Sequence, residues 1–220
     1  MTKTMKVADV TTTIPEGAAL MIGGFMGIGS PHRLIDELVR QGKAGLTVIA
    51  NDTARPGFGI GKLIDARLVR RLITSHIGTN PETQRLMLAG EIEVELVPQG
   101  TLAERIRAGG YGLGGVLTST GVGTTVQNGK QTLKIDGRVF ILEKPLRADF
   151  ALIGARQADH VGNLTYALTA RNFNPLMAMA ADVVVAEAQE IVPVGVIPPD
   201  AVMTPAVLVD RLVSKERRRG

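Results

Sequence analysis

Apolar runs of strand length alternate along the chain with segments of helical periodicity. Residues 18–22, 46–50, 69–74, 92–97, 150–155 and 182–187 predict β-strands. Residues 31–41, 81–89 and 175–181 predict helices, and Thr101 with Glu104 three positions later matches a capping box at the start of a further helix. This alternation predicts an α/β fold in which helices flank an open, mainly parallel sheet.

A capping side chain precedes proline at three of the predicted helix starts. The three pairs are Ser30-Pro31, Asn80-Pro81 and Asn174-Pro175. The side-chain oxygen of a capping residue accepts hydrogen bonds from first-turn N–H groups, and a proline at the first helical position removes no needed donor. Gly42 is the predicted C-terminal stop of the first of these helices.

A β-hairpin is predicted around Asp136-Gly137, because apolar positions alternate on both sides and Asp-Gly suits a two-residue primed turn. The segment 109–129, rich in Gly, Ser and Thr, is expected to be a loop that covers or lines a site. The proline-rich segment 191–205 is expected to wrap the surface. Since the sequence shows no internal repeat, linker or second domain, the hairpin is expected to be a small insertion in a single domain spanning residues 1–220.

The composition limits both the core and the chemistry. With 45% hydrophobic but only 3% aromatic residues, the core must be aliphatic, and base-stacking platforms for single-stranded nucleic acid are not expected. Cysteine is absent, which excludes disulfides, thiolate metal sites and thiol catalysis. His32, His76 and His160 lie far apart without ligands at metal spacing, so no metal is expected.

The charge pattern favours a small polyanionic ligand over a nucleic acid. The net charge is +4, and much of the excess lies in the basic segment 215–219. The N-terminus lacks the apolar core of a signal peptide, and the longest apolar stretch, residues 18–28, is too short and glycine-rich to span a bilayer. We therefore expect a cytoplasmic protein with neither nucleic acid nor a membrane as partner.

Four glycines lie between the first predicted strand and the first long helix. Such a turn brings backbone N–H groups close to a ligand because no Cβ intervenes, and the helix start behind it favours an anion. The alternative is that the glycines only let strand and helix pack closely. The candidate binding residues of this turn are Gly23, Gly24, Phe25, Met26, Gly27, Ile28 and Gly29.

Two amide side chains also follow predicted strands. Asn51 comes directly after the strand at 46–50, and Gln99 follows the strand at 92–97 and one proline. In open α/β sheets the ligand crevice lies beyond the carboxyl ends of the strands, so both amides and the glycine turn are expected on one rim. Uncharged amides there can donate to a developing oxyanion, whereas the simpler interpretation is that each one satisfies loop backbone.

These residues resemble the class I coenzyme A transferases of the 3-oxoacid type. The first signature of that family is similar to Gly-Gly-Phe-x-x-x-Gly-x-Pro at residues 23–31. Further matching segments lie at residues 51–52, 75–80, 98–107, 118–125 and 170–175, so the resemblance covers nearly the whole chain. It implies the open α/β fold of CoA-transferases.

The resemblance also implies an activity. Members of the family move CoA between an acyl-CoA, such as acetoacetyl-CoA, and a free carboxylic acid, such as acetate, through a glutamyl anhydride and a glutamyl-CoA thioester. CoA is then a substrate, and no metal or prosthetic group is implied. By this resemblance residues 23–29 would contact CoA, and Asn51 and Gln99 would polarise or orient the acyl carbonyl.

The nucleophilic glutamate of the family lies in a Ser-Glu-Asn-Gly motif that this sequence lacks. Glu91, Glu93 and Glu95 instead alternate along one predicted strand and are expected on its solvent face. In the family the glutamate can belong to a separate β subunit. The resemblance therefore implies that this chain is an α subunit supplying half of the active site, within an α2β2 heterotetramer.

Two other functions remain open at this point. The chain can be a self-sufficient enzyme, such as a sugar-phosphate isomerase or deaminase, with Asp52 and either Glu82 or Glu104 as its acid/base pair. It can also be a non-enzymatic module that binds acyl-CoA or another effector. The lack of a DNA-reading element weighs against the second alternative.

Overall fold

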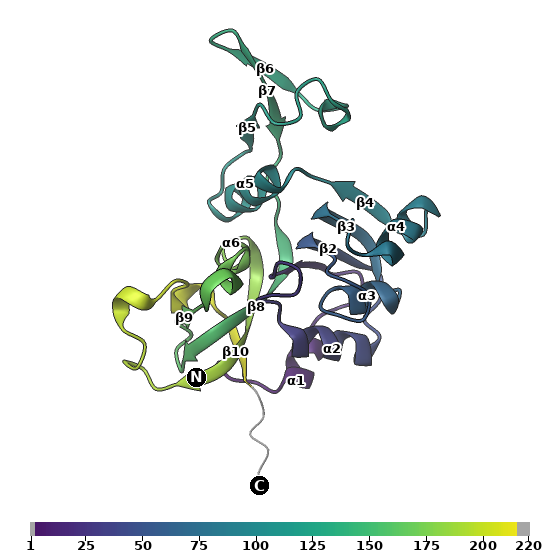
Figure 1. Ribbon diagram of the computed structural model, residues 1–220. Helices are drawn as coiled ribbons and strands as arrows, with labels where there is room; N and C mark the ends of the chain where they lie inside the picture. The colour runs from purple at the N-terminus through teal and green to yellow at the C-terminus, as the bar shows by residue number, and fades with distance from the viewer. Residues whose placement is uncertain (1–2, 215–220) are drawn as a thin grey trace.

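The computed structural model describes residues 3–214, so the basic segment 215–219 lies outside the described residues. Within that range an eight-stranded sheet forms the body, and a three-stranded sheet projects from it (Figure 1). The order in the central sheet is β11-β10-β8-β1-β2-β3-β4, and the short β9 pairs with β8. All pairings along this order are parallel, which confirms the predicted fold class.

The strands of the two sheets differ in length and direction. The central strands are β1 (Ala19–Ile22), β2 (Leu46–Asp52), β3 (Val69–His76), β4 (Glu93–Leu96), β8 (Ala148–Asp159), β9 (Leu164–Thr165), β10 (Ala181–Val192) and β11 (Arg211–Ser214). The antiparallel projecting strands are β5 (Val116–Thr118), β6 (Thr132–Ile135) and β7 (Arg138–Glu143). The predicted hairpin is confirmed, since β6 and β7 join at Asp136 and Gly137, both with positive φ.

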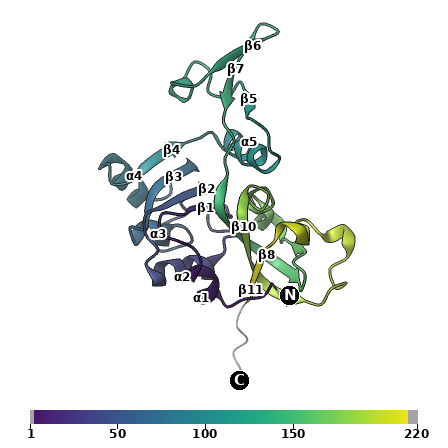
Figure 2. The same cartoon turned by 180° about the vertical axis from the view of Figure 1, so that it is seen from behind.

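Helices cover both faces of the central sheet (Figure 2). The first face packs against α1 (Val7–Thr12), α2 (His32–Gln41), α3 (Gly61–Asp65) and α4 (Pro81–Leu88). The second face packs against α5 (Gln99–Gly110) and α6 (Asn174–Met177). Short 3-10 turns complete the chain at Thr125–Gln127, Leu168–Arg171, Pro199–Ala201 and Ala206–Leu208.

The core is aliphatic, as the composition predicts, and strand alternation divides it into two layers. In β1, Leu20 and Ile22 join the cluster that includes Leu34 of α2, whereas Met21 joins the cluster that includes Leu102 of α5. All five side chains are fully buried. Because β1 is buried on both faces, its sequence is continuously apolar. Its fixed place in the core holds the glycine turn that follows it.

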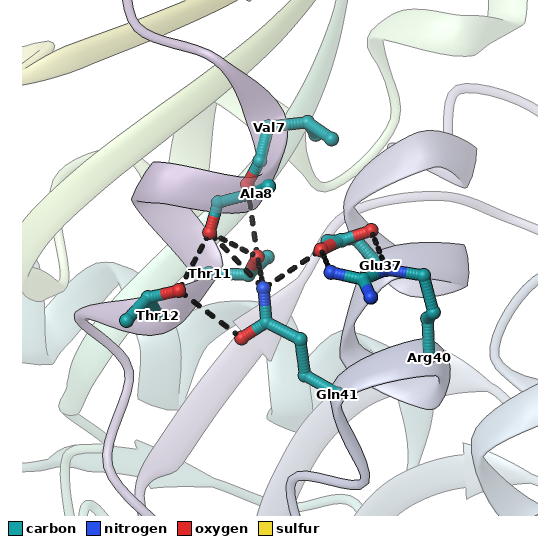
Figure 3. Close-up of polar contacts among 7 residues, drawn as sticks. All are labelled: Val7, Ala8, Thr11, Thr12, Glu37, Arg40 and Gln41. Atoms are coloured by element: carbon teal, nitrogen blue, oxygen red, sulfur yellow. Dashed lines mark hydrogen bonds and ion pairs between the residues drawn. The ribbon is translucent and has the colours of Figure 1, made fainter.

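A polar network fixes α1 against α2 on the first face (Figure 3). The Nε2 of Gln41 donates to the Ala8 carbonyl at 3.0 Å, to Thr11 Oγ1 at 2.8 Å and to Glu37 Oε1 at 2.7 Å. The hydrogen bond from Arg40 to Glu37, aided by Gln41, holds the pKa of that carboxyl below its usual range. The N-terminal helix is thereby tied to the element that begins behind the glycine turn.

The strand order reverses between β1 and β8. After β1 the chain builds outward through β2, β3 and β4, and then returns to lay β8 on the other side of β1. Ligands of open α/β folds bind at such a switch point, beyond the carboxyl ends of the strands. The glycine turn leaves β1 at this point.

Two of the predicted helix ends are confirmed. Asn80 caps α4 by accepting from the N–H of Thr83 at 3.2 Å, with proline in the first turn. Gly42 ends α2 in the left-handed conformation, and its N–H donates to the carbonyls of Leu38 and Val39.

The other three capping predictions are wrong. Helix α2 begins after Pro31 without a side-chain cap, and α5 begins at Gln99, ahead of the predicted Thr101 capping box. Asn174 is the first residue of α6 but does not cap it, because its amide is used to join other segments. The residue that flanks α2 is Pro31, whose side chain has no hydrogen-bonding group, and α5 is already helical at Thr101.

The structure differs most from the prediction in the lengths of some elements and in short elements that were not predicted. The helix predicted at 175–181 ends at Met177, because Ala181 already pairs with Ala148 in the sheet. Segment 109–129 includes β5 and a 3-10 turn rather than being only a loop, and α1, α3, β9 and β11 are not evident from the sequence pattern. Among residues 3–214, no helix has the length and apolar character needed to cross a bilayer.

Candidate functional site

The two predicted amides lie together at the carboxyl ends of the strands. Gln99 is the first residue of α5, and its Nε2 donates to Oδ1 of Asn51 at 2.7 Å. Asn51 lies near the end of β2 and is 2% exposed, whereas Gln99 is exposed. The hydroxyl of Ser75 on β3 also donates to Asn51 Oδ1 at 3.1 Å. The exposed amide is therefore supported by a buried one.

Asp52 connects this amide pair to the glycine turn. Its Oδ2 accepts from Asn51 Nδ2 at 2.7 Å and from the N–H of Met26 at 2.8 Å, and its Oδ1 accepts from the N–H of Ala54 at 2.7 Å. The carboxylate is 4% exposed. A continuous chain of hydrogen bonds thus runs from Gln99 through Asn51 and Asp52 to the turn.

The backbone of the glycine turn is mostly engaged within the protein. The N–H of Gly23 donates to the Leu152 carbonyl, and the N–H of Gly24 donates to Asn172 Oδ1. Phe25 and Ile28 exchange N–H to carbonyl bonds with each other. Within residues 3–214, the amides of Gly27 and Gly29 donate to no acceptor of the protein and are the donors left for a ligand.

Asn174 explains why the turn needs glycine at its start. Its Oδ1 accepts from the N–H of Gly154 at 3.0 Å, and its Nδ2 donates to the carbonyls of Gly29 and Ala170. A Cβ on Gly23 would lie 1.8 Å from that Oδ1. The close packing considered as an alternative in the sequence analysis therefore applies at Gly23.

A second turn closed by an isolated antiparallel bridge stands beside the first. Phe25 and Ile28 bridge across one turn, and Arg55 and Phe58 bridge across the other, directly after β2. The two turns touch, since a Cβ on Gly27 would lie 2.1 Å from the Phe58 ring. No repeat was predicted from the sequence, although Gly57, Gly59 and Gly61 after a strand indicate a second glycine turn.

The start of α2 is not open to a ligand in the way the sequence suggested. Glu187 of β10 accepts from the N–H of Leu34 at 2.9 Å and pairs with Arg33 at 3.3 Å. A carboxylate of the chain itself therefore occupies a first-turn donor and offsets the partial positive charge of the helix end. His32 has a structural role, since its Nε2 lies 3.0 Å from the Gly27 carbonyl and its ring packs on Phe58.

Two hollows flank the glycine turn. A cavity of about 600 Å³ lies at the switch point between the turn, β8 and β10, and it is lined by Gly27, Gly29, Arg33, Phe58, Arg156, Tyr166 and Glu187 among others. Burial raises the pKa of Tyr166 to about 12, so its hydroxyl stays protonated. A second hollow of about 420 Å³ is lined by Phe25, Ile28, Thr169 and Asn172. The larger cavity has the size of a small-molecule site.

The acid/base pair of the isomerase alternative is not assembled. In the described chain Asp52 bonds to backbone and amide donors, whereas Glu82 pairs with Arg67 and Arg85. The hydrogen bond from Arg85 lowers the pKa of Glu82. Glu104 is paired with Arg107. Among residues 3–214, no three His, Asp or Glu side chains lie close enough to hold a metal ion.

The glutamates predicted on a solvent face are ion-paired. Arg71 contacts Glu93 and Glu95, and Arg105 reaches Glu95 at 2.6 Å. Burial acts to raise the pKa of Glu95, but the hydrogen bonds and positive charges of Arg105 and Arg71 together outweigh it, so the pKa lies below its usual range. These carboxylates therefore serve structure on the β4 side of the sheet.

Comparison with known proteins places the chain in a family. The family model described as Coenzyme A transferase matches residues 3–215. The acetate CoA-transferase subunit alpha of Escherichia coli K12 is 54% identical over 218 residues, covering 99% of both chains. The acetoacetyl-CoA:acetate/butyrate CoA transferase alpha subunit of Clostridium acetobutylicum is 47% identical and covers 97% of this chain and 98% of its own.

Solved structures agree on the fold. An acyl-CoA transferase of Escherichia coli O157:H7, in a thioester complex with CoA, superposes with a TM-score of 0.87 at 24% identity. That match covers 97% of this chain, which spans 47% of the longer chain. The glutaconate CoA-transferase of Acidaminococcus fermentans superposes with a TM-score of 0.82 at 20% identity, covering 96% of this chain and 75% of its own. At these identities the likeness establishes the fold alone.

The chain therefore belongs to the coenzyme A transferase family, as its motifs indicated. The structure brings Asn51 and Gln99 together and links them to the glycine turn. It also shows roles that were not predicted from the sequence: Asp52 links the amides to the turn, and Asn172 and Asn174 support the turn.

Proposed function

We propose that this chain is the α subunit of a heteromeric CoA-transferase that moves CoA between a short-chain acyl-CoA and a free carboxylic acid. The observation that carries the proposal is the hydrogen-bonded series from Gln99 through Asn51 and Asp52 to Met26, at the strand ends of a CoA-transferase fold. Relatives of nearly the same length are named alpha subunits of acetate and acetoacetyl-CoA:acetate/butyrate transferases. They support acetate and acetoacetyl-CoA as the first substrates to test.

The proposed chemistry needs a nucleophilic glutamate, which we assign to the β subunit because this sequence lacks the Ser-Glu-Asn-Gly motif. A glutamate of the β subunit attacks the thioester carbonyl, the C–S bond breaks, and CoA leaves as a thiolate. The thiolate then attacks the glutamyl carbonyl of the anhydride, releasing the acyl group as a free acid and leaving a glutamyl-CoA thioester. The incoming acid reverses these steps. Neither a metal nor a prosthetic group is part of this proposal, and CoA enters as a substrate.

The burial of the two amides suggests different roles for them. A carboxamide nitrogen carries two hydrogens, and Gln99 gives one of them to Asn51. The second can be donated to the oxyanion that forms on the acyl carbonyl. Asn51 is buried and has Oδ1 and Nδ2 both engaged, so we assign it the role of orienting Gln99.

The glycine turn is proposed to hold CoA. The free amides of Gly27 and Gly29 and the cavity of about 600 Å³ lie on one side of it, and the exposed Phe25 and Ile28 border the hollow on the other. These side chains suit the apolar parts of a pantetheine arm. The assembly that we propose is α2β2, as the resemblance implies.

One assay separates this proposal from its rivals. The chain is purified alone and together with its β subunit, and CoA transfer from acetoacetyl-CoA to acetate is followed. We expect no turnover from either subunit alone and turnover from the mixture. Full activity of the lone chain would contradict the division of the site, and sugar-phosphate isomerase activity would support the self-sufficient enzyme. CoA binding without turnover in any mixture would support the effector-binding module.

A further inference from the structure

The projecting sheet, here called the arm (residues 116–143), has one apolar face. In the antiparallel register Leu133 lies opposite Phe140, and Leu117 lies opposite Leu142. Directly opposed residues share a face, and residues two apart on a strand return to it. The apolar arm face therefore consists of Leu117, Leu133, Ile135, Phe140 and Leu142, with Arg138 at its outer end.

This face is uncovered along its length, whereas the opposite face is buried at the base of the arm. In the described structure none of the five apolar side chains is buried, and Ile135 is 43% exposed. On the other face Ile141 and Glu143 are buried, and Lys130 pairs with Glu143 at 2.6 Å. Both views show the β6–β7 hairpin standing clear of the helices (Figures 1 and 2). A single-layer sheet with an open apolar face lacks its packing partner.

The apolar arm face continues toward the candidate site. Leu117 also lines a cleft of about 350 Å³ whose other wall is the first turns of α5, including Gly100, Thr101 and Glu104. Gln99 is the residue at which α5 begins. A partner that covers the arm and fills this cleft therefore arrives beside Gln99.

A buried arginine holds the arm at a fixed place relative to α5. Arg105 of α5 is 7% exposed and donates to the Lys144 carbonyl at 2.9 Å and to Glu95 at 2.6 Å. Its own carbonyl accepts from the N–H of Leu146 at 2.9 Å. The strand that leaves the arm is thus fastened to the helix that carries Gln99, so docking on the arm sets the position of a partner at the site.

We propose that the apolar arm face is the docking surface for the β subunit. This inference rests on the proposed function, which requires a second subunit to bring its glutamate to Gln99. A second copy of this chain would not bring that glutamate, because its sequence lacks the Ser-Glu-Asn-Gly motif. The cleft beside Leu117 leads the occupant of the face toward Gln99, where the proposed chemistry needs the carboxylate of the β subunit.

The arm offers a matched pair of variants for a test. Ile135 and Val139 are both β-branched, are 43% and 40% exposed, and lie on opposite faces of one hairpin. We expect Ile135→Asp to weaken binding of the β subunit at least ten-fold by titration calorimetry. Val139→Asp is expected to change the dissociation constant less than two-fold. Thermal unfolding of each lone chain verifies that both variants fold.

The outcomes distinguish the occupants. Equal effects of the two variants, or none, would overturn the proposal. A second result would also overturn it. If the lone chain is a dimer in light scattering, and Ile135→Asp makes it monomeric without changing binding of the β subunit, the face serves a second copy of this chain. CoA transfer by the wild-type mixture is measured separately. Wild-type subunits that bind through this face without any turnover would refute the proposed function and leave the docking surface standing.

Discussion

Gln99 donates to Asn51 across 2.7 Å, and this contact joins the first residue of α5 to the end of β2. The two residues are separated by 48 positions in the sequence, yet Asn51 lies at the end of β2 and Gln99 follows β4 of the same sheet. Through this contact the buried Asn51 orients the exposed amide of Gln99. Kinetics of single substitutions can therefore distinguish the role of Asn51, which orients the amide, from the role of Gln99, which donates the hydrogen bond.

Gln99→Ala is expected to lower turnover and leave CoA binding largely unchanged. Removal of one donor to a developing oxyanion costs roughly 10²–10³ in kcat. Steady-state CoA transfer with the β subunit present measures kcat, and calorimetry measures CoA binding. Gln157→Ala removes a partly exposed amide that donates to Glu190 on the neighbouring strand, and it is the matched control. An unchanged rate for Gln99→Ala would remove Gln99 from the site.

Asn51→Ala is expected to act through Gln99. If Asn51 only orients that amide, the double variant should be nearly as active as the single Gln99→Ala variant. Residues in direct contact show coupling energies of about 0.5–3 kcal/mol in double-mutant cycles. The cycle is measured on kcat. Strictly additive losses would show that Asn51 contacts the substrate by itself.

Asp52→Ala is expected to destabilise the chain and loosen the glycine turn. The substitution leaves the buried donors of Asn51, Met26 and Ala54 without acceptors, and an unsatisfied buried donor costs about 1–3 kcal/mol. Urea unfolding measures the loss, and hydrogen exchange should speed up at the Met26 amide. Asp65→Ala provides the control, since Asp65 is an exposed carboxylate that accepts from the Gly57 amide of the second turn. Unaltered exchange at Met26 would show that Asp52 does not hold the turn.

The sequence predicts the fold well where the pattern repeats. Strand β1, for example, is a continuous apolar run, and the alternation of such runs with helical segments indicates the class. Asn51 and Gln99 were predictable on one rim of the sheet because each follows a predicted strand. Their direct hydrogen bond was not predictable, because it depends on the strand order that places β3 between β2 and β4.

Short elements and supports could not be predicted, for a physical reason. Helix α3 spans five residues and is stabilised by tertiary packing of Leu63 and Ile64 rather than by a periodic face. Asn174 carries the sequence pattern of a helix cap, but a buried carbonyl on Gly29 and an N–H on Gly154 compete for its amide. The sequence does not reveal which of these local and distant partners prevails.

Gly23→Ala tests whether close packing sets the glycine at the start of the turn. The new Cβ would meet Oδ1 of Asn174, which is fully buried and held by several hydrogen bonds, so the side chain cannot move aside freely. Overpacking of this kind costs about 1–3 kcal/mol. Gly114→Ala is the control, because its Cβ would meet open space and its φ is ordinary. Equal unfolding midpoints in urea for both variants would contradict this role of Asn174.

The turn after β8 should make stability depend on pH in the acid range. Burial acts to raise the pKa of Asp159, but hydrogen bonds from Asn163, Gly162 and Val161 outweigh it, so the pKa lies below its usual value. A carboxyl with a lowered pKa contributes stability that is present above its unfolded pKa of about 3.9 and is lost as the pH falls through the folded value. Asp159→Asn is therefore expected to reduce the free energy of unfolding at pH 7 by about 1–3 kcal/mol, in line with the loss of charge-assisted hydrogen bonds.

The difference between wild type and Asp159→Asn should shrink as the pH is lowered below about 3.9, where the wild-type carboxyl begins to lose its advantage. Urea unfolding at a series of pH values from 7 to 3 measures it. Asp182→Asn is the control, since Asp182 is an exposed residue paired with Arg147 at the surface. A difference for Asp159→Asn that stays constant or widens toward acid would mean that the carboxylate charge does not stabilise this turn, and that the neutral amide geometry alone accounts for the loss.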